Sequence, residues 1–107
     1  MTGIYKITNK INNKMYIGQS KDIKKRWKQH LYEMNNKKSH SYNYELYRSM
    51  RKHGVENFSF DILEECNVED LNRREMYWVN FYDTYFNGYN KTLGGEQSSR
   101  VDKKIIL

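Results

Sequence analysis

The N-terminal part of the chain holds two apolar and aromatic stretches, residues 4–8 and 15–17, separated by the polar run Asn-Lys-Ile-Asn-Asn-Lys. β-Branched and aromatic residues favour strands and a polar run of this kind favours a turn, so the unit predicts an antiparallel hairpin. On pairing, Tyr5 and Tyr16 can lie close together beside Gly18, where a glycine lets another group approach. A simpler alternative is that the two tyrosines only pack a core.

Three later segments repeat apolar residues at helical spacing. The pattern predicts helices over about residues 23–34 and 42–53, with Gly54 ending the second, and a third helix that opens between Asn67 and Asp70. The predicted core-facing residues are Ile23, Trp27, Leu31 and Met34 in the first helix, Leu46, Tyr47 and Met50 in the second, and Leu71, Trp78, Val79 and Tyr82 in the third.

A third strand is predicted over residues 58–63, where Phe58, Phe60 and Ile62 alternate with their neighbours. This strand should join the hairpin, because an isolated two-stranded hairpin is only marginally stable. The expected fold class is therefore α+β, with a small three-stranded antiparallel β-sheet flanked by helices. Residues 1–95 form the expected domain, and residues 96–107 a C-terminal tail at which a linker could begin.

Composition narrows the kind of partner. The 107 residues include 19 Lys and Arg against 13 Asp and Glu, a formal net charge of +6. A basic, aromatic-rich chain indicates a polyanion as partner, although lysine-rich surfaces also serve solubility alone. The lone Cys66 allows no internal disulfide and no zinc site by itself, and no apolar run reaches membrane-spanning length. We expect an intracellular protein that works where nucleic acid is.

Two polar side chains of the first predicted helix deserve separate treatment. Arg26 and His30 lie one helical turn apart and so share a face. Because this helix follows the hairpin directly, it must pack on it, and the shared face can look toward Tyr5 and Tyr16. The planar, permanently charged guanidinium of arginine can pair with two oxygens of a phosphate. A solvated face is the usual alternative for such a pair.

Glu75 is the acidic residue whose predicted surroundings most need an explanation. Its spacing from Leu71 and Trp78 places it on the apolar stripe of the third helix. A carboxylate on a core-facing side is costly unless a cation accompanies it, which can be a side chain or a metal ion. The alternatives to a metal site are a buried Glu–Arg ion pair and an edge position that reaches solvent.

The tripeptides Gly3-Ile4-Tyr5 and Tyr16-Ile17-Gly18, followed in order by Arg26, His30, a glutamate and a late asparagine, resemble the signature of the GIY-YIG nuclease family. The resemblance covers residues 2–95. The opening Gly-Ile-Tyr-Lys-Ile-Thr-Asn, the Lys-His-Gly after the second helix and the late Asn-Gly-Tyr-Asn look most like the catalytic domain of homing endonucleases. Repair and restriction nucleases share the same core, and a non-catalytic basic module that binds nucleic acid is a rival of a different class.

The resemblance implies a metal-dependent endonuclease that hydrolyses phosphodiester bonds of double-stranded DNA. Such an enzyme is expected to work with DNA in the cytoplasm or nucleoid of a bacterial or virus-infected cell. It implies that Glu75 holds one Mg²⁺ or Mn²⁺ ion, that Arg26 stabilises charge on the scissile phosphate, and that Asn90 contacts the active site. We expect Tyr5 to act as general base, which requires a strongly positive field, and His30 to take or relay its proton. Tyr16 is expected to hydrogen-bond the phosphate or bound water.

Further residues are expected to contact DNA without taking part in the chemistry. Ser20 lies at the start of the first helix, where it could bind a phosphate oxygen. The expected DNA-binding set is Ser20, Lys21, Lys25, Lys37, Lys38 and His40. We expect a monomer in isolation, with no membrane partner and no disulfide-linked partner.

Overall fold

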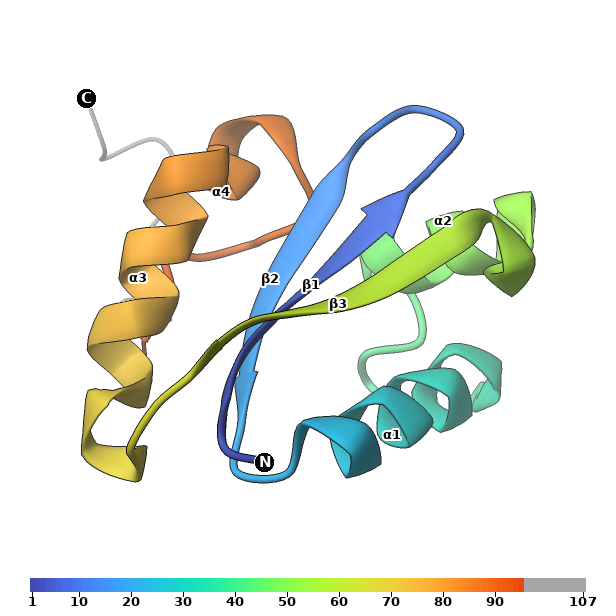
Figure 1. The fold of residues 1–107 in the computed structure, drawn as a ribbon. Helices are drawn as coiled ribbons and strands as arrows, with labels where there is room; N and C mark the ends of the chain where they lie inside the picture. The colour runs from blue at the N-terminus through green and yellow to red at the C-terminus, as the bar shows by residue number, and fades with distance from the viewer. Residues whose placement is uncertain (96–107) are drawn as a thin grey trace.

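The computed structural model describes residues 1–95 and centres on a three-stranded antiparallel sheet (Figure 1). The strands are β1 (Gly3–Asn9), β2 (Met15–Ser20) and β3 (Phe58–Glu65), in the order β2-β1-β3. Both neighbours of β1 run antiparallel to it. The predicted hairpin and third strand are confirmed, while the predicted tail, residues 96–107, lies outside the described residues.

The register of the hairpin brings the two signature tripeptides together. Tyr5 pairs with Gly18, and Ile7 pairs with Tyr16. On the other side of β1 the register with β3 shifts between Ile4 and Tyr5. Tyr5 therefore lies in the central strand and opposite a glycine, which leaves room for its ring.

Helices α1 (Ile23–Asn35) and α2 (Glu45–His53) cover the sheet face that carries Tyr5 and Ile7 (Figure 1). The Asp22 side chain caps α1 by accepting a hydrogen bond from the Lys25 N–H, at 3.2 Å. Gly54, at a φ of 87°, ends α2 as predicted. The buried core between these elements consists of Tyr5, Ile7, Ile23, Met34, Leu46, Tyr47, Met50, Phe58 and Tyr89.

Helices α3 (Leu71–Tyr82) and α4 (Thr84–Asn87) lie on the opposite face (Figure 1). They enclose a second core cluster made of Ile4, Ile17, Leu71, Val79 and Tyr85. Both faces of the small sheet are thus covered, which explains why Ile4 and Tyr5, on opposite faces of β1, are both fully buried. No helix among the described residues is long and apolar enough to cross a membrane.

Two helix starts differ from the sequence predictions, and two short elements were not predicted. Helix α2 begins at Glu45 and not at residue 42, because residues 39–44 form successive turns. A 3-10 turn, η2 (Val68–Asp70), precedes α3, and the Asp70 carboxylate pairs with Arg73 at 3.2 Å where a capping bond was expected. The short helix α4, and a second 3-10 turn, η1 (Val55–Asn57), were not predicted at all.

Candidate active site

A chain of three buried polar side chains joins β1 to both helices of its face. The Tyr5 hydroxyl lies 2.6 Å from His30 Nε2, and His30 Nδ1 lies 2.7 Å from the Tyr47 hydroxyl. The three residues are 0%, 1% and 4% exposed. The prediction that His30 faces Tyr5 is confirmed, since α1 packs on the hairpin and turns this side chain inward.

Tyr16 and Arg26 complete the cluster. The Tyr16 ring centroid lies 6.3 Å from that of Tyr5 and 5.7 Å from that of His30. The Arg26 guanidinium lies close enough to both tyrosine hydroxyls for its charge to lower their pKa values. The expectation that the Arg26/His30 face looks toward both tyrosines is therefore confirmed.

Burial nevertheless dominates the protonation states of this cluster. It raises the pKa of Tyr5 well above the ordinary value, and the nearby Tyr16 adds to the rise against the opposing charge of Arg26. Burial likewise raises the pKa of Tyr16, with Glu75 as the next contribution, and that of Tyr47 to about 12. Burial and then Arg26 lower the pKa of His30 to about 3. In the protein alone, all three tyrosines and the imidazole are neutral at pH 7.

Gly18 is required by the close approach of Tyr5. A Cβ atom at this position would lie 2.3 Å from both the Cζ and the hydroxyl oxygen of Tyr5. Tyr5 is fully buried in the central strand and cannot move aside cheaply. Gly18, the last residue of the second signature tripeptide, thus leaves the space that the Tyr5 ring occupies.

Glu75 lies on α3, near the other end of the site. It is half-buried, so it stands at the edge of the apolar stripe, where Leu71 and Val79 are the buried members. Its Oε1 accepts hydrogen bonds from Gln19 Nε2 at 3.1 Å and from the Gly95 N–H at 2.6 Å. None of the ion pairs among the described residues includes it, so the alternative of a Glu–Arg pair is not what the structure contains.

The surroundings of Glu75 fit one hard divalent cation. Its two hydrogen-bond donors, the Gln19 amide and the Gly95 N–H, are neutral and use only one carboxylate oxygen. The charge of Glu75 is close enough to Tyr16 to raise the pKa of that tyrosine. Within residues 1–95, no three His, Cys, Asp or Glu side chains gather into a metal-binding group. A single carboxylate suits Mg²⁺, which keeps several waters and is commonly completed by substrate phosphate.

Asn90 is connected to the site by two hydrogen bonds with the backbone of β2. Its Oδ1 accepts from the Ile17 N–H at 2.8 Å, and its Nδ2 donates to the Ile17 carbonyl at 2.9 Å. Because β2 is an edge strand, these two bonds satisfy main-chain groups that have no neighbouring strand. Asn90 thereby fixes the strand next to Tyr16, while a contact with substrate stays a prediction.

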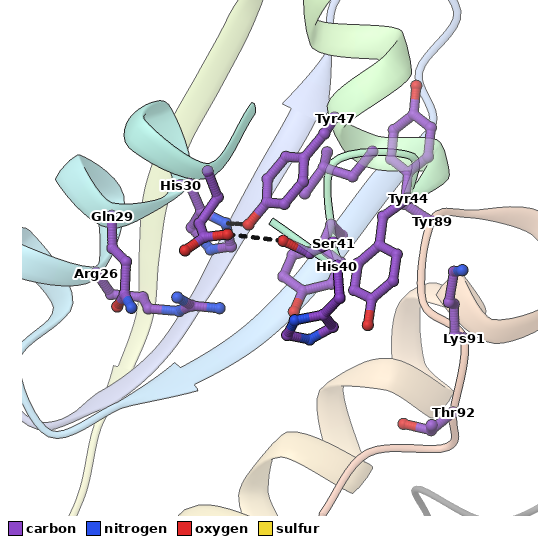
Figure 2. Close-up of a pocket in the computed structure, with 13 residues that line it drawn as sticks. Arg26, Gln29, His30, His40, Ser41, Tyr44, Tyr47, Tyr89, Lys91 and Thr92 are labelled. Carbon is purple, nitrogen blue, oxygen red and sulfur yellow. Dashed lines mark hydrogen bonds between the residues drawn. The ribbon is translucent and has the colours of Figure 1, made fainter. Parts of the chain in front are cut away.

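A cavity of about 520 Å³ opens beside this cluster (Figure 2). Arg26 enters it from α1, and Lys91 and Thr92 face it from the segment after α4. Tyr47 and Tyr44 form another part of its wall. Sequence reasoning left Tyr47 as a core residue and did not single out Tyr44 or Lys91, because periodicity gives no signal for which residues from separate elements line one cavity.

The residues predicted to contact DNA are not gathered at one place. His40 lines the cavity, on a loop held where the Glu33 carboxylate accepts hydrogen bonds from Ser39 and, at 2.8 Å, from Ser41. The Ser20 hydroxyl accepts from the Asp22 N–H at 2.9 Å, so it already helps to shape the start of α1. The exposed lysines of the set are Lys21, Lys25, Lys37 and Lys38.

A model of the GIY-YIG catalytic domain matches residues 1–90. The chain belongs to this family of nuclease catalytic domains, as the signature tripeptides predicted. The arrangement of Tyr5, Tyr16, Arg26, His30 and Glu75 described above is thus the candidate active site of a known enzyme class.

Two relatives of the chain carry names that connect them with introns. The chain is 43% identical over 111 residues to intron-associated endonuclease 1 of Enterobacteria phage T4, covering 99% of this chain and 44% of the relative. It is 34% identical over 88 residues to probable intron-encoded endonuclease 1 of Neurospora crassa, covering 82% of this chain and 27% of the relative. The chain therefore spans less than half the length of these curated relatives.

Solved structures confirm the predicted fold class. The catalytic domain of the homing endonuclease I-TevI superposes with a TM-score of 0.73 at 38% identity, covering 84% of this chain and 97% of that one. A mutant of the same catalytic domain superposes with a TM-score of 0.74 at 40% identity, covering 84% and 92%. The three-stranded antiparallel sheet with flanking helices is the fold of a homing endonuclease catalytic domain.

Proposed function

We propose that this chain is the catalytic part of a homing-type endonuclease that hydrolyses phosphodiester bonds of double-stranded DNA with the help of one divalent cation. The observation that carries the proposal is the convergence of Tyr5, Tyr16, His30 and Arg26 in one cluster, with Glu75 close enough to raise the pKa of Tyr16. A protein that only binds nucleic acid has no need of this cluster. The two intron-associated relatives favour homing over repair or restriction.

Arg26 provides the fixed positive charge of the proposed mechanism. Its guanidinium projects into the cavity, where it can meet two oxygens of a phosphate (Figure 2). Charge that builds on the phosphoryl oxygens in the transition state is stabilised best by a donor that is already in place. The charge of Arg26 lowers the pKa values of Tyr5 and Tyr16, so the guanidinium lies beside both of these tyrosines.

Tyr5 is the proposed general base toward the attacking water. Its hydroxyl proton passes to His30 Nε2, at 2.6 Å, and the Tyr5 oxygen then takes a proton from the water. Because burial raises the pKa of Tyr5, this step needs more positive charge than Arg26 alone provides. Tyr16, half-buried at the cavity wall, is placed to hydrogen-bond the phosphate or the water.

Glu75 is the proposed ligand of the cation, which we infer to be Mg²⁺ or Mn²⁺. A bound divalent cation supplies neutralisation of phosphate charge and of the departing oxygen. The Gln19 amide and the Gly95 N–H orient the carboxylate for this purpose. Asn90 keeps β2, and with it Tyr16, in place.

The DNA backbone is proposed to run over the exposed lysines and toward the cavity. Lys21 and Lys25 lie near the start of α1, and Lys37 and Lys38 lie on the loop that carries His40. Such contacts neutralise phosphates without reading sequence. Choice of a target site would then depend on more than these residues.

The decisive experiment is nicking of supercoiled plasmid DNA by the purified protein, with Mg²⁺, with Mn²⁺ and with EDTA. Glu75→Ala is the test variant, and Glu69→Ala, an exposed acidic residue of the turn before α3, is its matched control. We expect metal-dependent cleavage by the wild type and by Glu69→Ala, and none by Glu75→Ala. Metal-independent cleavage, or full activity of Glu75→Ala, would exclude the metal role; DNA binding without cleavage in any protein would favour a binding module.

A further inference from the structure

The Tyr47 hydroxyl is hydrogen-bonded to His30 Nδ1, the ring nitrogen that the proposed mechanism does not use. The distance from His30 Nδ1 to this hydroxyl is 2.7 Å. Tyr47 is 4% exposed, its ring meets that of His30 edge-on with centroids 5.7 Å apart, and it stacks on Tyr44 with an interplanar angle of 8°. The position of its hydroxyl is therefore fixed by packing on two sides.

A neutral imidazole that is hydrogen-bonded to two hydroxyls donates to one of them and accepts from the other. It has one N–H donor and one nitrogen acceptor, so one of Tyr5 and Tyr47 donates to His30 and the other accepts from it. The ring is neutral, because burial and the charge of Arg26 lower its pKa to about 3. Two tautomers are possible, and only one of them leaves Nε2 able to take a proton from Tyr5.

Burial of the Tyr5 hydroxyl decides between the two tautomers. Tyr5 is 0% exposed, and among residues 1–95 the one acceptor within hydrogen-bond distance of its hydroxyl is His30 Nε2, at 2.6 Å. If Nε2 carried the imidazole proton, the hydroxyl hydrogen of Tyr5 would be buried without an acceptor, which is costly. The positive charge of Arg26 also favours a Tyr5 proton that points away from it. With Nε2 accepting, the imidazole proton sits on Nδ1 and points at the Tyr47 oxygen.

We propose that Tyr47 is a positioning residue that holds His30 in the Nδ1–H tautomer and so keeps Nε2 open for the proton of Tyr5. In the step itself the Tyr5 O–H bond breaks and an Nε2–H bond forms, which leaves a tyrosinate and an imidazolium. The Tyr47 oxygen accepts the Nδ1–H bond before and after this transfer. Tyr47 also lines the cavity, so its own hydroxyl proton can be donated to water there. The catalytic meaning of this role rests on the proposed function, but the tautomer is a property of the protein without DNA.

The first test is the ¹⁵N NMR spectrum of the histidine side chains in the whole chain, which distinguishes the two tautomers directly. The chain has three histidines, and loss of one signal set in His30→Asn assigns His30. We expect the wild-type spectrum to show His30 with its proton on Nδ1. A wild-type ring protonated on Nε2 overturns the proposal, whatever any variant does.

Tyr47→Phe supplies the second test, with Tyr89→Phe as its matched control. Both tyrosines are 4% exposed in the same core cluster, but the Tyr89 hydroxyl bonds to Asn9, at 3.0 Å, and to Ser49, at 2.7 Å, and not to His30. Loss of one hydrogen bond worth about 1–1.5 kcal/mol should shift the His30 tautomer ratio toward Nε2–H by about tenfold in Tyr47→Phe. Tyr89→Phe should leave the ratio unchanged, and an unchanged ratio in both variants overturns the proposal.

The activity of Tyr47→Phe then connects the tautomer to catalysis. We expect kcat for DNA nicking to fall by up to about tenfold with KM unchanged, in proportion to the fraction of His30 that remains in the Nδ1–H tautomer. A shifted tautomer with undiminished kcat would overturn the link to the reaction. If no protein of the set cleaves DNA, the proposed function fails, and the NMR result still decides whether Tyr47 fixes His30.

Discussion

The two faces of the central sheet bury side chains of different chemistry. The face under α1 and α2 buries Tyr5, His30 and Tyr47 in one hydrogen-bonded chain. The face under α3 and α4 buries a cluster that is aliphatic except for one ring, namely Ile4, Ile17, Leu71, Val79 and Tyr85. The face under α1 and α2 carries the candidate active site. The face under α3 and α4 contributes only Glu75, which lies at the edge of the apolar stripe of α3.

This difference separates stabilisation from chemistry within one small domain. A buried hydrogen-bonded pair contributes little net stability, whereas leaving one partner unpaired is expensive. An aliphatic cluster stabilises through burial alone. The hydrogen-bonded chain of Tyr5, His30 and Tyr47 therefore adds little to the stability of the fold, and variants on the two faces should separate in folding and in activity.

The largest loss of folding stability is expected from Leu71→Ala on the aliphatic face. Leu71 is 5% exposed, and truncation of a buried leucine costs about 2–5 kcal/mol of unfolding free energy. Activity per folded molecule should stay near that of the wild type, since Leu71 touches none of the cluster around Tyr5. Urea unfolding and plasmid nicking measured on the same preparations check this, and a wild-type unfolding midpoint would contradict it.

Arg26→Ala should give the opposite pattern. Loss of the fixed positive charge should lower the nicking rate by about 10²–10³-fold, while the folded state loses only a half-buried side chain. Lys24→Ala, on the exposed side of the same helix, is the control for loss of one positive charge. Equal losses of rate in Arg26→Ala and Lys24→Ala would mean that overall charge matters and the position of Arg26 does not.

Gly18→Ala should lower both folding stability and nicking rate, because Gly18 lies in β2 directly against the Tyr5 side chain. The added methyl group would lie 2.3 Å from the Tyr5 hydroxyl oxygen, and overpacking of a buried position costs about 1–3 kcal/mol. Displacement of Tyr5 should also lower the nicking rate. A variant with wild-type stability and rate would show that Tyr5 has more freedom than its burial indicates.

The expected effect that is smallest between neighbouring samples is a pH dependence of stability that belongs to His30. Its pKa falls from an ordinary value near 6.5 to about 3 on folding, so the unfolded chain binds a proton below pH 6.5 that the folded protein refuses. Stability contributed by the neutral ring is full above pH 6.5 and is lost toward pH 3, by at most about 1.4 kcal/mol per pH unit.

Urea unfolding at pH 7, 6 and 5 tests this prediction in a range above most carboxylate titrations. His30→Gln should lack the part of the slope that the wild type shows, and His53→Gln, with its half-exposed ring, should retain it. Identical slopes in all three proteins would contradict the assignment of the slope to His30.

Much of the fold was readable from local patterns. β-Branched and aromatic stretches around a polar turn predicted the hairpin, and alternation predicted β3. Helical periodicity predicted α1, α2 and α3 with their inward faces. The boundaries were less accurate, since turns replaced the predicted first residues of α2 and a 3-10 turn precedes α3. Helix α4 was not predicted because an Asn-Gly pair locally indicates a turn, and four residues are too few to show a helical period.

The site divides in the same way. The signature tripeptides and the helical spacing of Arg26 and His30 were enough to predict that these residues meet, because strand pairing and helix faces follow from periodicity. The partners of Glu75 were not predictable, since one comes from β2 and the other from the segment after α4. The predicted core-facing position of Glu75 was therefore only partly right.

The sequence by itself determined the class of enzyme domain, the strands and helices, and which face of each element turns inward. Tertiary structure alone decided that Tyr47 holds His30 Nδ1, that Gln19 and Gly95 hold Glu75, and that Asn90 bonds to the backbone of Ile17. The physical reason is that periodicity reports the direction of a side chain within its own element. Which atom it then meets depends on how separate elements pack, and no local pattern along the chain records that distance.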